Sequence, residues 1–508
     1  MEREYIVSLQ EGVDYDQFWH EMETATWSVA HVPDRTVDII NERPGSLRSC
    51  HYSLTDAEAD ALRRNPRVYS VEIPPDQRDD ISIGFSAVQF NNYTKTTSSS
   101  GNFVNWALLR CVSDFNNYGT ATTADGGFPF TIDGTGVDVV IHDSGLQTDH
   151  PEFGGRVQTI NWYVESGLPG TQSENFYRDW DGHGTHVGGI VAGQNYGWAK
   201  NARIYSMKVA GLEGSGDSGT GIPVSDCFDA VKLWHQNKPV DPATGFKRPT
   251  VVNMSWGYSS TFTNINGGVY RGVAWSGTTK RTEYGMIGSS NRFGVRVGSV
   301  DVDLAEMVSV GIVVCVAAGN SYQKIDVSGG LDWDNRYNRT GVGNVYYHRG
   351  SSPSDPSAIS VGSIDSTVYD ATTEYKSVFS DSGPGIDIWA PGSNILSSCS
   401  TVNEYSAPAY SFDSNYKQVN ISGTSMASPQ VAGVAALYLE LNPWATPAQV
   451  KAWLQANSKS VVYSTGLDSD YTNSRSIMSS SNRFLFNPFN RQHPIATAGD
   501  VGLVALAL

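Results

Sequence analysis

The feature that most constrains this chain is a series of short, continuous apolar runs that alternate with helical patterns between about residues 105 and 487. Strands buried on both faces of a sheet have such continuous runs, and helices between them cover the two faces. We therefore predict an α/β fold with a mostly parallel sheet and helices on both faces. The predicted strands are 136–145, 202–211, 250–257, 311–320 and 358–365, and the clearest predicted helices between them are 224–236 and 302–311.

The remaining segments suggest how the chain is divided. The N-terminal unit is predicted as a small α+β domain, because the strand-like YIVSL and 67–73 flank a helical pattern at 53–66. Polar, aperiodic sequence follows it and indicates a linker. Two stretches rich in Gly, Ser, Asn and Tyr interrupt the large domain and are interpreted as long loops or insertions. The expected division is a small domain at 1–80, a linker at 81–104, a large domain at 105–489 with insertions near 258–300 and 321–352, and a C-terminal tail at 490–508.

Composition excludes several classes of protein. The net charge is −17, whereas a nucleic-acid-binding protein normally has a basic face, so no nucleic-acid partner is expected. No run of eighteen apolar residues is present, and a membrane span is not expected. The N-terminus lacks an apolar core segment, so no cleavable signal peptide is expected either. Five scattered cysteines predict no metal cluster and leave at least one unpaired within the chain, and Cys315 is expected as a small buried apolar residue.

Three motifs carry reactive side chains. Asp143 ends a predicted buried strand in VVIHDSG, a pattern that is also common in turns. His183 and His186 lie in DGHGTHVGGIVAG, where a metal pair is an alternative that the glycine between them weakens. Ser425 lies in SGTSMASPQVAGVAALYLELNP, where it opens a helix and its hydroxyl is expected near the positive end of the helix dipole. The third motif is much the most specific.

These segments resemble the Asp, His and Ser blocks of the subtilisin family, in the chain order of that family. The resemblance is strongest to the proteinase-K-like branch. It continues through residues 106–110, 196–220, 377–395 and 442–454, so that it covers most of 105–487. Residues 4–75 resemble the inhibitor-type propeptide of the same family, through YIVSL at one end and ALRRNPRVYSVE at the other.

The resemblance implies a role for each matching residue. Ser425 would be the nucleophile, His183 the general base and Asp143 the residue that orients the imidazole. Asn320 would donate its side-chain amide to the oxyanion. His186 would be a packed structural residue. Two backbone segments would line the primary specificity pocket, namely Ser255, Trp256 and Gly257 with Ala317, Ala318 and Gly319.

Some positions depart from the family pattern. His142 stands before the expected catalytic Asp143, either as a satisfied core histidine or as a group that perturbs the aspartate. The stretch 191–201 lacks the loop that builds the strong calcium site of many relatives, and that site is expected to be absent. By analogy to the proteinase-K-like branch, a weaker structural calcium site could form from the carbonyls of Pro356 and Ala358 and the carboxylate of Asp387. The equally weighted alternative is that Asp387 is only solvated. No cofactor is expected to be required.

The expected function is that of a serine endopeptidase that cleaves polypeptide substrates. Its N-terminal domain would act as an intramolecular inhibitor that is removed by self-cleavage within about 76–104. The alternative is a structural or assembly protein, for example of a virus particle, with a protease domain as one component. A degenerate pseudoprotease is disfavoured, because all four key positions are intact. An extracellular or virion-associated location is expected in preference to a purely cytoplasmic one. The sequons at Asn92 and Asn338 are compatible with secretion but do not decide the location.

Overall fold

The computed structural model describes residues 2–24, 30–84, 106–114, 130, 132–173, 176–210, 222–242, 244–288, 291–464 and 475–490. Predictions for most of the linker, at 85–104, and for the tail, at 491–508, lie outside these residues. Within them, no helix has both the length and the apolar character needed to cross a membrane. The five cysteines are all described, and each is buried and forms no disulfide.

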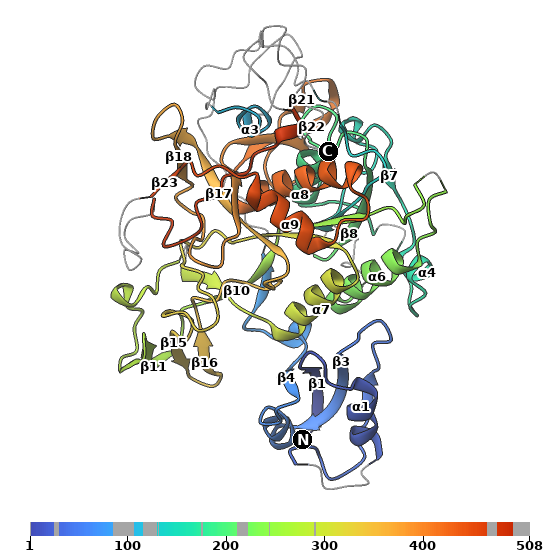
Figure 1. Ribbon diagram of the computed structural model, residues 1–508. Helices are drawn as coiled ribbons and strands as arrows, with labels where there is room; N and C mark the ends of the chain where they lie inside the picture. The colour runs from blue at the N-terminus through green and yellow to red at the C-terminus, as the bar shows by residue number, and fades with distance from the viewer. Residues whose placement is uncertain are drawn as a thin grey trace.

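A nine-stranded sheet forms the centre of the large domain (Figure 1). Its strands follow the order β23-β18-β17-β14-β9-β6-β8-β7, and β19 also pairs with β17. All these pairs are parallel except β17 with β18, which confirms the predicted mostly parallel sheet. The strands are β6 (Asp138–Asp143), β7 (Val157–Gln158), β8 (Arg203–Lys208), β9 (Thr250–Met254), β14 (Val313–Ala317), β17 (Ile359–Val368), β18 (Glu374–Lys376), β19 (Ile388–Pro391) and β23 (Val462–Tyr463).

Helices cover both faces of this sheet. Successive side chains of each strand point to opposite faces, so each buried strand packs against helices on both sides. On β6, Val139 and Ile141 belong to one hydrophobic cluster and Val140 to the other. Helices α3, α5, α8 and α9 contribute to the first cluster, and α4, α6 and α7 contribute to the second. The helices are α3 (Trp106–Arg110), α4 (Trp162–Ser166), α5 (His183–Ala192), α6 (Val224–Asn237), α7 (Gly298–Ser309), α8 (Thr424–Leu441) and α9 (Pro447–Ala456).

The N-terminal unit is a small domain with its own core. Its antiparallel sheet has the order β2-β3-β1-β4, and the domain lies beside α6 and α7 in Figure 1. The predicted helix at 53–66 is shorter in the structure, because residues 53–55 end a strand and Thr55 forms a capping box with Glu58. The elements are β1 (Glu2–Leu9), α1 (Tyr15–Thr24), β2 (Ile39–Asn41), β3 (Ser49–Thr55), α2 (Asp56–Leu62) and β4 (Val68–Glu72).

The segments 258–300 and 321–352, interpreted as long loops or insertions, are not plain loops, since both contain strands. Four of these strands form an antiparallel sheet of order β12-β11-β15-β16, which we call the insertion sheet. Its strands are short, rich in Gly and Asn, and half-exposed, so they lack the apolar run that marks a buried strand. The strands are β10 (Gly257–Thr261), β11 (Ile265–Tyr270), β12 (Val273–Trp275), β13 (Arg292–Gly294), β15 (Arg336–Arg339) and β16 (Gly343–Tyr346).

Two further three-stranded sheets complete the described part of the fold. One has the order β13-β10-β5, in which β5 (Ser82–Gly84) comes from the start of the predicted linker. The other has the order β20-β22-β21, with β20 (Ile395–Cys399), β21 (Ala409–Tyr410) and β22 (Asp413–Ile421). The first brings the chain that follows the small domain onto the large domain. Single turns of 3-10 helix lie at Pro75–Gln77, Pro151–Phe153, Thr282–Tyr284 and Pro488–Asn490.

Candidate active site

Asp143 and His183 meet at the carboxyl end of the central sheet. Asp143 is the last residue of β6 and His183 is the first residue of α5, and both are fully buried. His183 Nδ1 lies 2.7 Å from Asp143 Oδ1, which also accepts the Ser144 backbone N–H at 2.8 Å. Burial alone would lower the pKa of His183, but the charge and hydrogen bond of Asp143 outweigh it and raise this pKa. The Asp143 carboxylate therefore stabilises the cationic form of the His183 imidazole relative to a free histidine.

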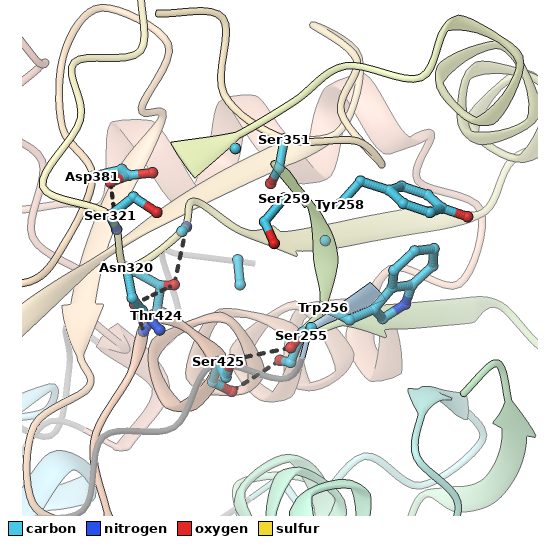
Figure 2. A pocket seen from close by; sticks show the side chains of 15 residues that line it. Ser255, Trp256, Tyr258, Ser259, Asn320, Ser321, Ser351, Asp381, Thr424 and Ser425 are labelled. Carbon is cyan, nitrogen blue, oxygen red and sulfur yellow. Dashed lines mark hydrogen bonds between the residues drawn. The ribbon is translucent and has the colours of Figure 1, made fainter. Parts of the chain in front are cut away.

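Ser425 is the second residue of α8 and lies beside the end of β9. Its hydroxyl donates to the Ser255 carbonyl at 3.0 Å, and the Ser255 hydroxyl donates back to the Ser425 carbonyl at 2.9 Å (Figure 2). Asn253 extends this link, because it donates to Ser255 Oγ and accepts from Ser428 Oγ, each at 2.8 Å. The start of α8 is thereby fixed to the segment that follows β9.

Asn320 follows β14 and faces the same end of α8. Its Oδ1 accepts the backbone N–H and the hydroxyl of Thr424, each at 2.9 Å. Thr424 Oγ1 in turn accepts the Gly319 backbone N–H at 3.0 Å. These bonds use the oxygen of the Asn320 carboxamide and fix the orientation of this side chain at the start of α8.

A buried polar network that sequence reasoning missed joins the aspartate and histidine motifs. Asp179 accepts from Ser144 Oγ at 2.9 Å and from the backbone N–H groups of Gly182 and Thr185 at 2.8 Å each. Burial raises the pKa of Asp179. A Cβ at Gly184 would lie 2.1 Å from the Gly145 carbonyl oxygen, so only glycine allows α5 to approach the turn after β6. The small and polar residues within DSG and DGHGT were the only sequence signal for this network and for the close approach of α5 to the turn.

His142 does not face Asp143. The two are adjacent on β6, and the His142 ring stacks on Trp256 and contacts Phe228 of α6. Its Nδ1 accepts the indole N–H of Trp256 at 3.2 Å. Burial lowers the pKa of His142 to about 3. Of the two alternatives, the structure favours the core histidine. His186 is likewise buried, with Nε2 3.0 Å from the Ile395 carbonyl and 3.1 Å from that of Val419.

A pocket adjoins Ser425 and brings the predicted specificity segments together (Figure 2). Ala318 is the exception among them, because it is buried behind the wall. Gly294 and Ser351, from the ends of the two insertions, also belong to the lining. The pocket is lined by Gly84, Ser255, Trp256, Gly257, Tyr258, Ser259, Gly294, Ala317, Gly319, Asn320, Ser321, Ser351, Asp381, Thr424 and Ser425.

The chain that leaves the N-terminal domain enters this pocket. Strand β5 pairs antiparallel with β10, and Gly84 is opposite Gly257, Ile83 opposite Tyr258. Ile83 packs against the second hydrophobic cluster of the large domain. Strand β5 thus lies at the wall of the pocket as a strand added to β10, in the manner in which extended peptides bind to a sheet edge.

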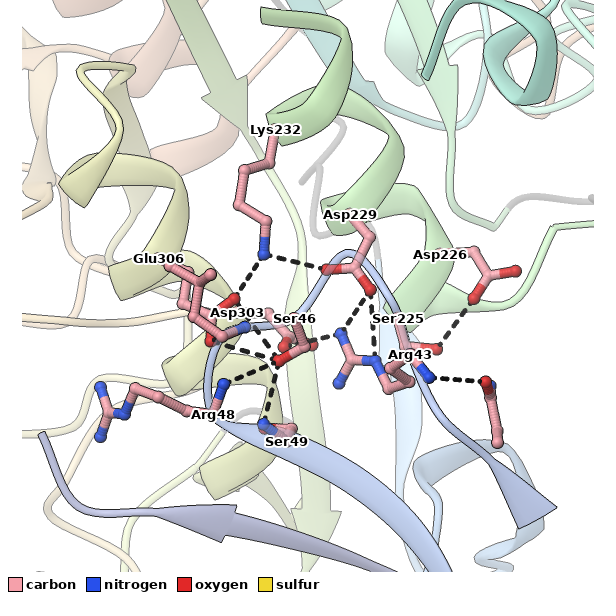
Figure 3. Close-up of polar contacts among 12 residues, drawn as sticks. Arg43, Ser46, Arg48, Ser49, Ser225, Asp226, Asp229, Lys232, Asp303 and Glu306 are labelled. Atoms are coloured by element: carbon pink, nitrogen blue, oxygen red, sulfur yellow. Dashed lines mark hydrogen bonds and ion pairs between the residues drawn. The ribbon is translucent and has the colours of Figure 1, made fainter. Parts of the chain in front are cut away.

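The N-terminal domain also makes a buried polar contact with α6 and α7 (Figure 3). Arg43 is 2% exposed, and its Nη2 lies 3.1 Å from Asp229 Oδ2 and 2.9 Å from Asp303 Oδ1. Glu306 accepts the Leu47 backbone N–H at 3.0 Å. Asp229, Asp303 and Glu306 are a group of carboxylates that could hold a metal ion. Here Arg43 and Lys232 supply the positive charges instead.

The residues predicted as calcium ligands come together, but around a different cation. The ammonium of Lys451 contacts the carbonyls of Pro356 and Ala358 and the carboxylate of Asp387. These side chains and carbonyls therefore do not fit the predicted calcium site as long as Lys451 is present.

The chain is similar to a family model, to proteins of known activity and to a solved structure. The model of the subtilase family, peptidase S8, matches residues 134–478. Proteinase T of Parengyodontium album is 30% identical over 350 residues, which are 68% of this chain and 84% of that protein. The extracellular serine proteinase of Thermus sp. (strain Rt41A) is 28% identical over 409 residues, 80% of this chain and 70% of that protein. The solved structure of fervidolysin from Fervidobacterium pennivorans, at 19% identity, is similar in fold with a TM-score of 0.53, over 98% of this chain and 62% of that one.

Proposed function

Because the chain belongs to the subtilase family of serine endopeptidases, we propose that Asp143, His183 and Ser425 form its catalytic triad. The observation that carries this proposal is the buried hydrogen bond of 2.7 Å between Asp143 and His183, on the side of the sheet where α8 presents Ser425. Each of the three residues lies at an element end fixed by polar contacts with a neighbouring segment.

The reaction follows the course established for subtilisin. The Ser425 oxygen attacks the scissile carbonyl as His183 Nε2 accepts its proton, and Asp143 stabilises the imidazolium that forms. His183 then donates that proton to the leaving amine, which leaves an acyl-enzyme on Ser425. Water attacks the ester by the same route in reverse and releases the second product. The hydroxyl must first leave the Ser255 carbonyl that it contacts in this structure.

Asn320 is proposed as the oxyanion donor. Two observations support this role: Thr424 holds Oδ1 and so fixes the orientation of the carboxamide, and Asn320 lines the same pocket as Ser425. The backbone N–H of Ser425, at the start of α8, would be the second donor. Donors that are preorganised in this way need no rearrangement when charge develops on the substrate oxygen.

Polypeptide substrates are proposed to bind as strands beside β10, as β5 does, with Ser255–Gly257, Ala317 and Gly319 lining the primary pocket. In the antiparallel register of β5, Gly84 is opposite Gly257. If an extended chain kept this register, the second residue after Gly84, which is Ser86, would be opposite Ser255. The Ser255 carbonyl is the contact of Ser425 Oγ. We therefore propose that the N-terminal domain is an inhibitor-type propeptide and that self-cleavage occurs after Ser86, to within about one residue.

Two measurements test this function. An organophosphonate should label the wild-type enzyme covalently, whereas Ser425→Ala should remain unlabelled and uncleaved; Ser460→Ala, at an exposed serine far along the chain, should behave as wild type. N-terminal sequencing of the matured enzyme should begin at residue 86, 87 or 88. A folded wild-type protein that refuses the label, or a Ser425→Ala chain that still matures in isolation, would contradict the triad. An N-terminus elsewhere would contradict the proposed register alone.

The relatives also bear on where the enzyme acts. One of them is by name an extracellular proteinase. We propose that this chain also acts outside the cell, and fractionation of the native source should then find the matured form in the medium. Recovery of only the intact chain, within a large assembly, would instead favour a structural role.

A further inference from the structure

A single lysine occupies the centre of a cluster of oxygens at the edge of the central sheet. Lys451 Nζ lies 2.9 Å from the Pro356 carbonyl, 2.7 Å from the Ala358 carbonyl and 2.8 Å from Asp387 Oδ2. An ammonium has three N–H donors, and these three acceptors satisfy all of them. Helix α9 provides the lysine, while the oxygens come from the turn before β17 and the residue before β19.

The same helix satisfies the rest of the carboxylate. Gln455 lies one turn after Lys451 on α9, and its Nε2 donates to Asp387 Oδ1 at 3.3 Å. The ion pair is partly shielded from solvent, because the side chains of Lys451 and Asp387 are 17% and 22% exposed. The charges of the two groups are equal and opposite.

Carbonyl and carboxylate oxygens are ligands of the kind that calcium prefers, since hard cations take oxygen ligands, and this cluster supplies three of the roughly six to eight that calcium uses. A calcium ion that contacted all three oxygens at the usual distances of roughly 2.3–2.6 Å would compete for its position with the Lys451 ammonium. It would also meet the repulsion of a fixed positive charge. The oxygens thus form a cation site, and a side chain of the same molecule already fills it.

We propose that Lys451 is a built-in cation that takes the place of a divalent ion at Pro356, Ala358 and Asp387, and that its removal opens this position to calcium. The wild-type chain then needs no calcium here, and its stability at this edge does not depend on the calcium concentration.

The position of the cluster explains why a cation is useful there. Asp387 and Ser360 are joined by two hydrogen bonds, from the Ser360 N–H to the carboxylate at 2.9 Å and from the Asp387 N–H to the Ser360 carbonyl at 3.0 Å. Ser360 is opposite Val316 of β14 in the parallel register. Asn320 lies just beyond the end of β14. The ammonium therefore ties α9 to the strand next to the proposed oxyanion donor.

Thermal unfolding and calcium titration of the full chain test the proposal, with Ser425→Ala as the common background to prevent self-digestion. Lys451→Ala should unfold at a temperature lower by about 2–6 °C in EDTA, and millimolar calcium should restore much of this loss. Calorimetric titration should detect a calcium-binding event in Lys451→Ala that the parent lacks. Adding Asp387→Asn should abolish that event, because the only carboxylate of the site is then gone.

Two outcomes would overturn the proposal. The first is a parent protein that binds calcium and loses this binding on Asp387→Asn. The second is a Lys451→Ala protein that is destabilised but gains neither stability nor heat on addition of calcium. If Lys451→Ala does not fold, Lys451→Gln keeps a hydrogen-bond donor without the charge, and the same titration decides in that variant.

Discussion

His142 and Asp143 are neighbours on β6 with opposite roles, because successive side chains of a strand face different sides of the sheet. Asp143 faces His183, and its charge more than offsets the effect of burial and raises the pKa of the imidazole. His142 faces α6, where burial lowers its pKa to about 3. Asp143 therefore favours the protonated form of His183, whereas burial favours the neutral form of His142.

The pH dependence of catalysis should follow His183 alone. Below its raised pKa the imidazole is protonated and cannot accept the serine proton, so kcat/KM should fall as the pH falls through that pKa. In His142→Phe, this acidic limb should stay where it is. The variant should be less stable by about 1–3 kcal/mol, because the buried indole N–H of Trp256 loses its acceptor. The pH–rate profile and denaturant unfolding measure the two effects separately.

Asp143→Asn serves as the contrasting variant. It should move the acidic limb of the residual activity to lower pH, since it removes the charge that raises the pKa of His183. A limb that moved in His142→Phe and not in Asp143→Asn would show that the two roles are assigned the wrong way round.

Asn320→Ala should lower kcat with little change in KM. The loss of about 10²–10³ is typical for one oxyanion donor, subtilisin included, because the donor acts mainly when negative charge develops on the substrate oxygen. Asn338→Ala, at an exposed position of β15, is the matched control and should leave both constants unchanged. Steady-state kinetics on a peptide substrate give the answer. A rise in KM with an unchanged kcat would speak against the role.

Asp143, His183, Ser425 and Asn320 could be selected from the sequence as candidates, because each lies in a short motif that resembles a block of the family. Their supports could not. Asp179 and Asn253 are single polar residues outside the recognised blocks, and only the fold brings them to Thr185 and Ser428. The contact of Lys451 could not be predicted either. The sequence of a helix does not indicate that one of its lysines contacts the oxygens expected to bind calcium.

Among the elements, the buried strands were the most predictable. Continuous apolar runs located β6, β8, β9, β14 and β17 to within a few residues. Helix α7 begins at Gly298, before its predicted start at 302, since Glu72 of the N-terminal domain accepts the backbone N–H groups of Gly298 and Ser299. A partner more than two hundred residues away therefore determines how this helix begins.

The pairing of Arg43 with α6 and α7 gives a prediction for the proposed propeptide. Loss of the guanidinium would leave Asp229 and Asp303 buried without a main partner, and breaking a buried pair in this way costs about 3–5 kcal/mol. Arg43→Met should therefore weaken the hold of the N-terminal domain on the enzyme. Activity should develop after self-cleavage with a shorter delay than in the wild type.

A continuous fluorogenic assay of freshly folded protein measures this delay. The control is Arg64→Ala, which removes an exposed arginine of the same domain and should leave the delay unchanged. An Arg43→Met enzyme with the wild-type delay would mean that the buried contact contributes little to inhibition.

The insertion sheet is the largest feature of the fold that the sequence did not indicate. It joins two segments that lie far apart in the chain, through the pairing of β11 with β15. Phe262, Phe293, Tyr337 and Tyr347 pack together beside it and belong to the second hydrophobic cluster. Aromatic residues scattered among Gly, Ser and Asn gave no periodic signal, although together they form this core.

Asp332 links the two insertions electrostatically. It lies 2.7 Å from Arg271 Nε, 2.9 Å from Lys324 Nζ and 2.7 Å from the side-chain nitrogen of Asn335. Burial would raise the pKa of Asp332, but the hydrogen bonds from Arg271 and Lys324 outweigh it, and the pKa lies below its usual value. The stabilising contribution is therefore present at neutral pH and is lost as the pH falls below about 4.

The contacts of Asp332 should also stabilise the wall of the cleft. Lys324 forms a β-bridge with Ser382, next to Asp381 of the pocket wall, and Ser351 of the lining ends the second insertion. Asp332→Asn should therefore raise KM for extended peptides at neutral pH while kcat stays the same, because the residues of the proposed triad lie on other elements. The unfolding temperature of the variant should also fall less between pH 6 and pH 3 than that of the wild type, as the variant has already lost the ionised partner. A changed kcat with an unchanged KM would place the effect of Asp332 on the triad instead of on the wall of the cleft.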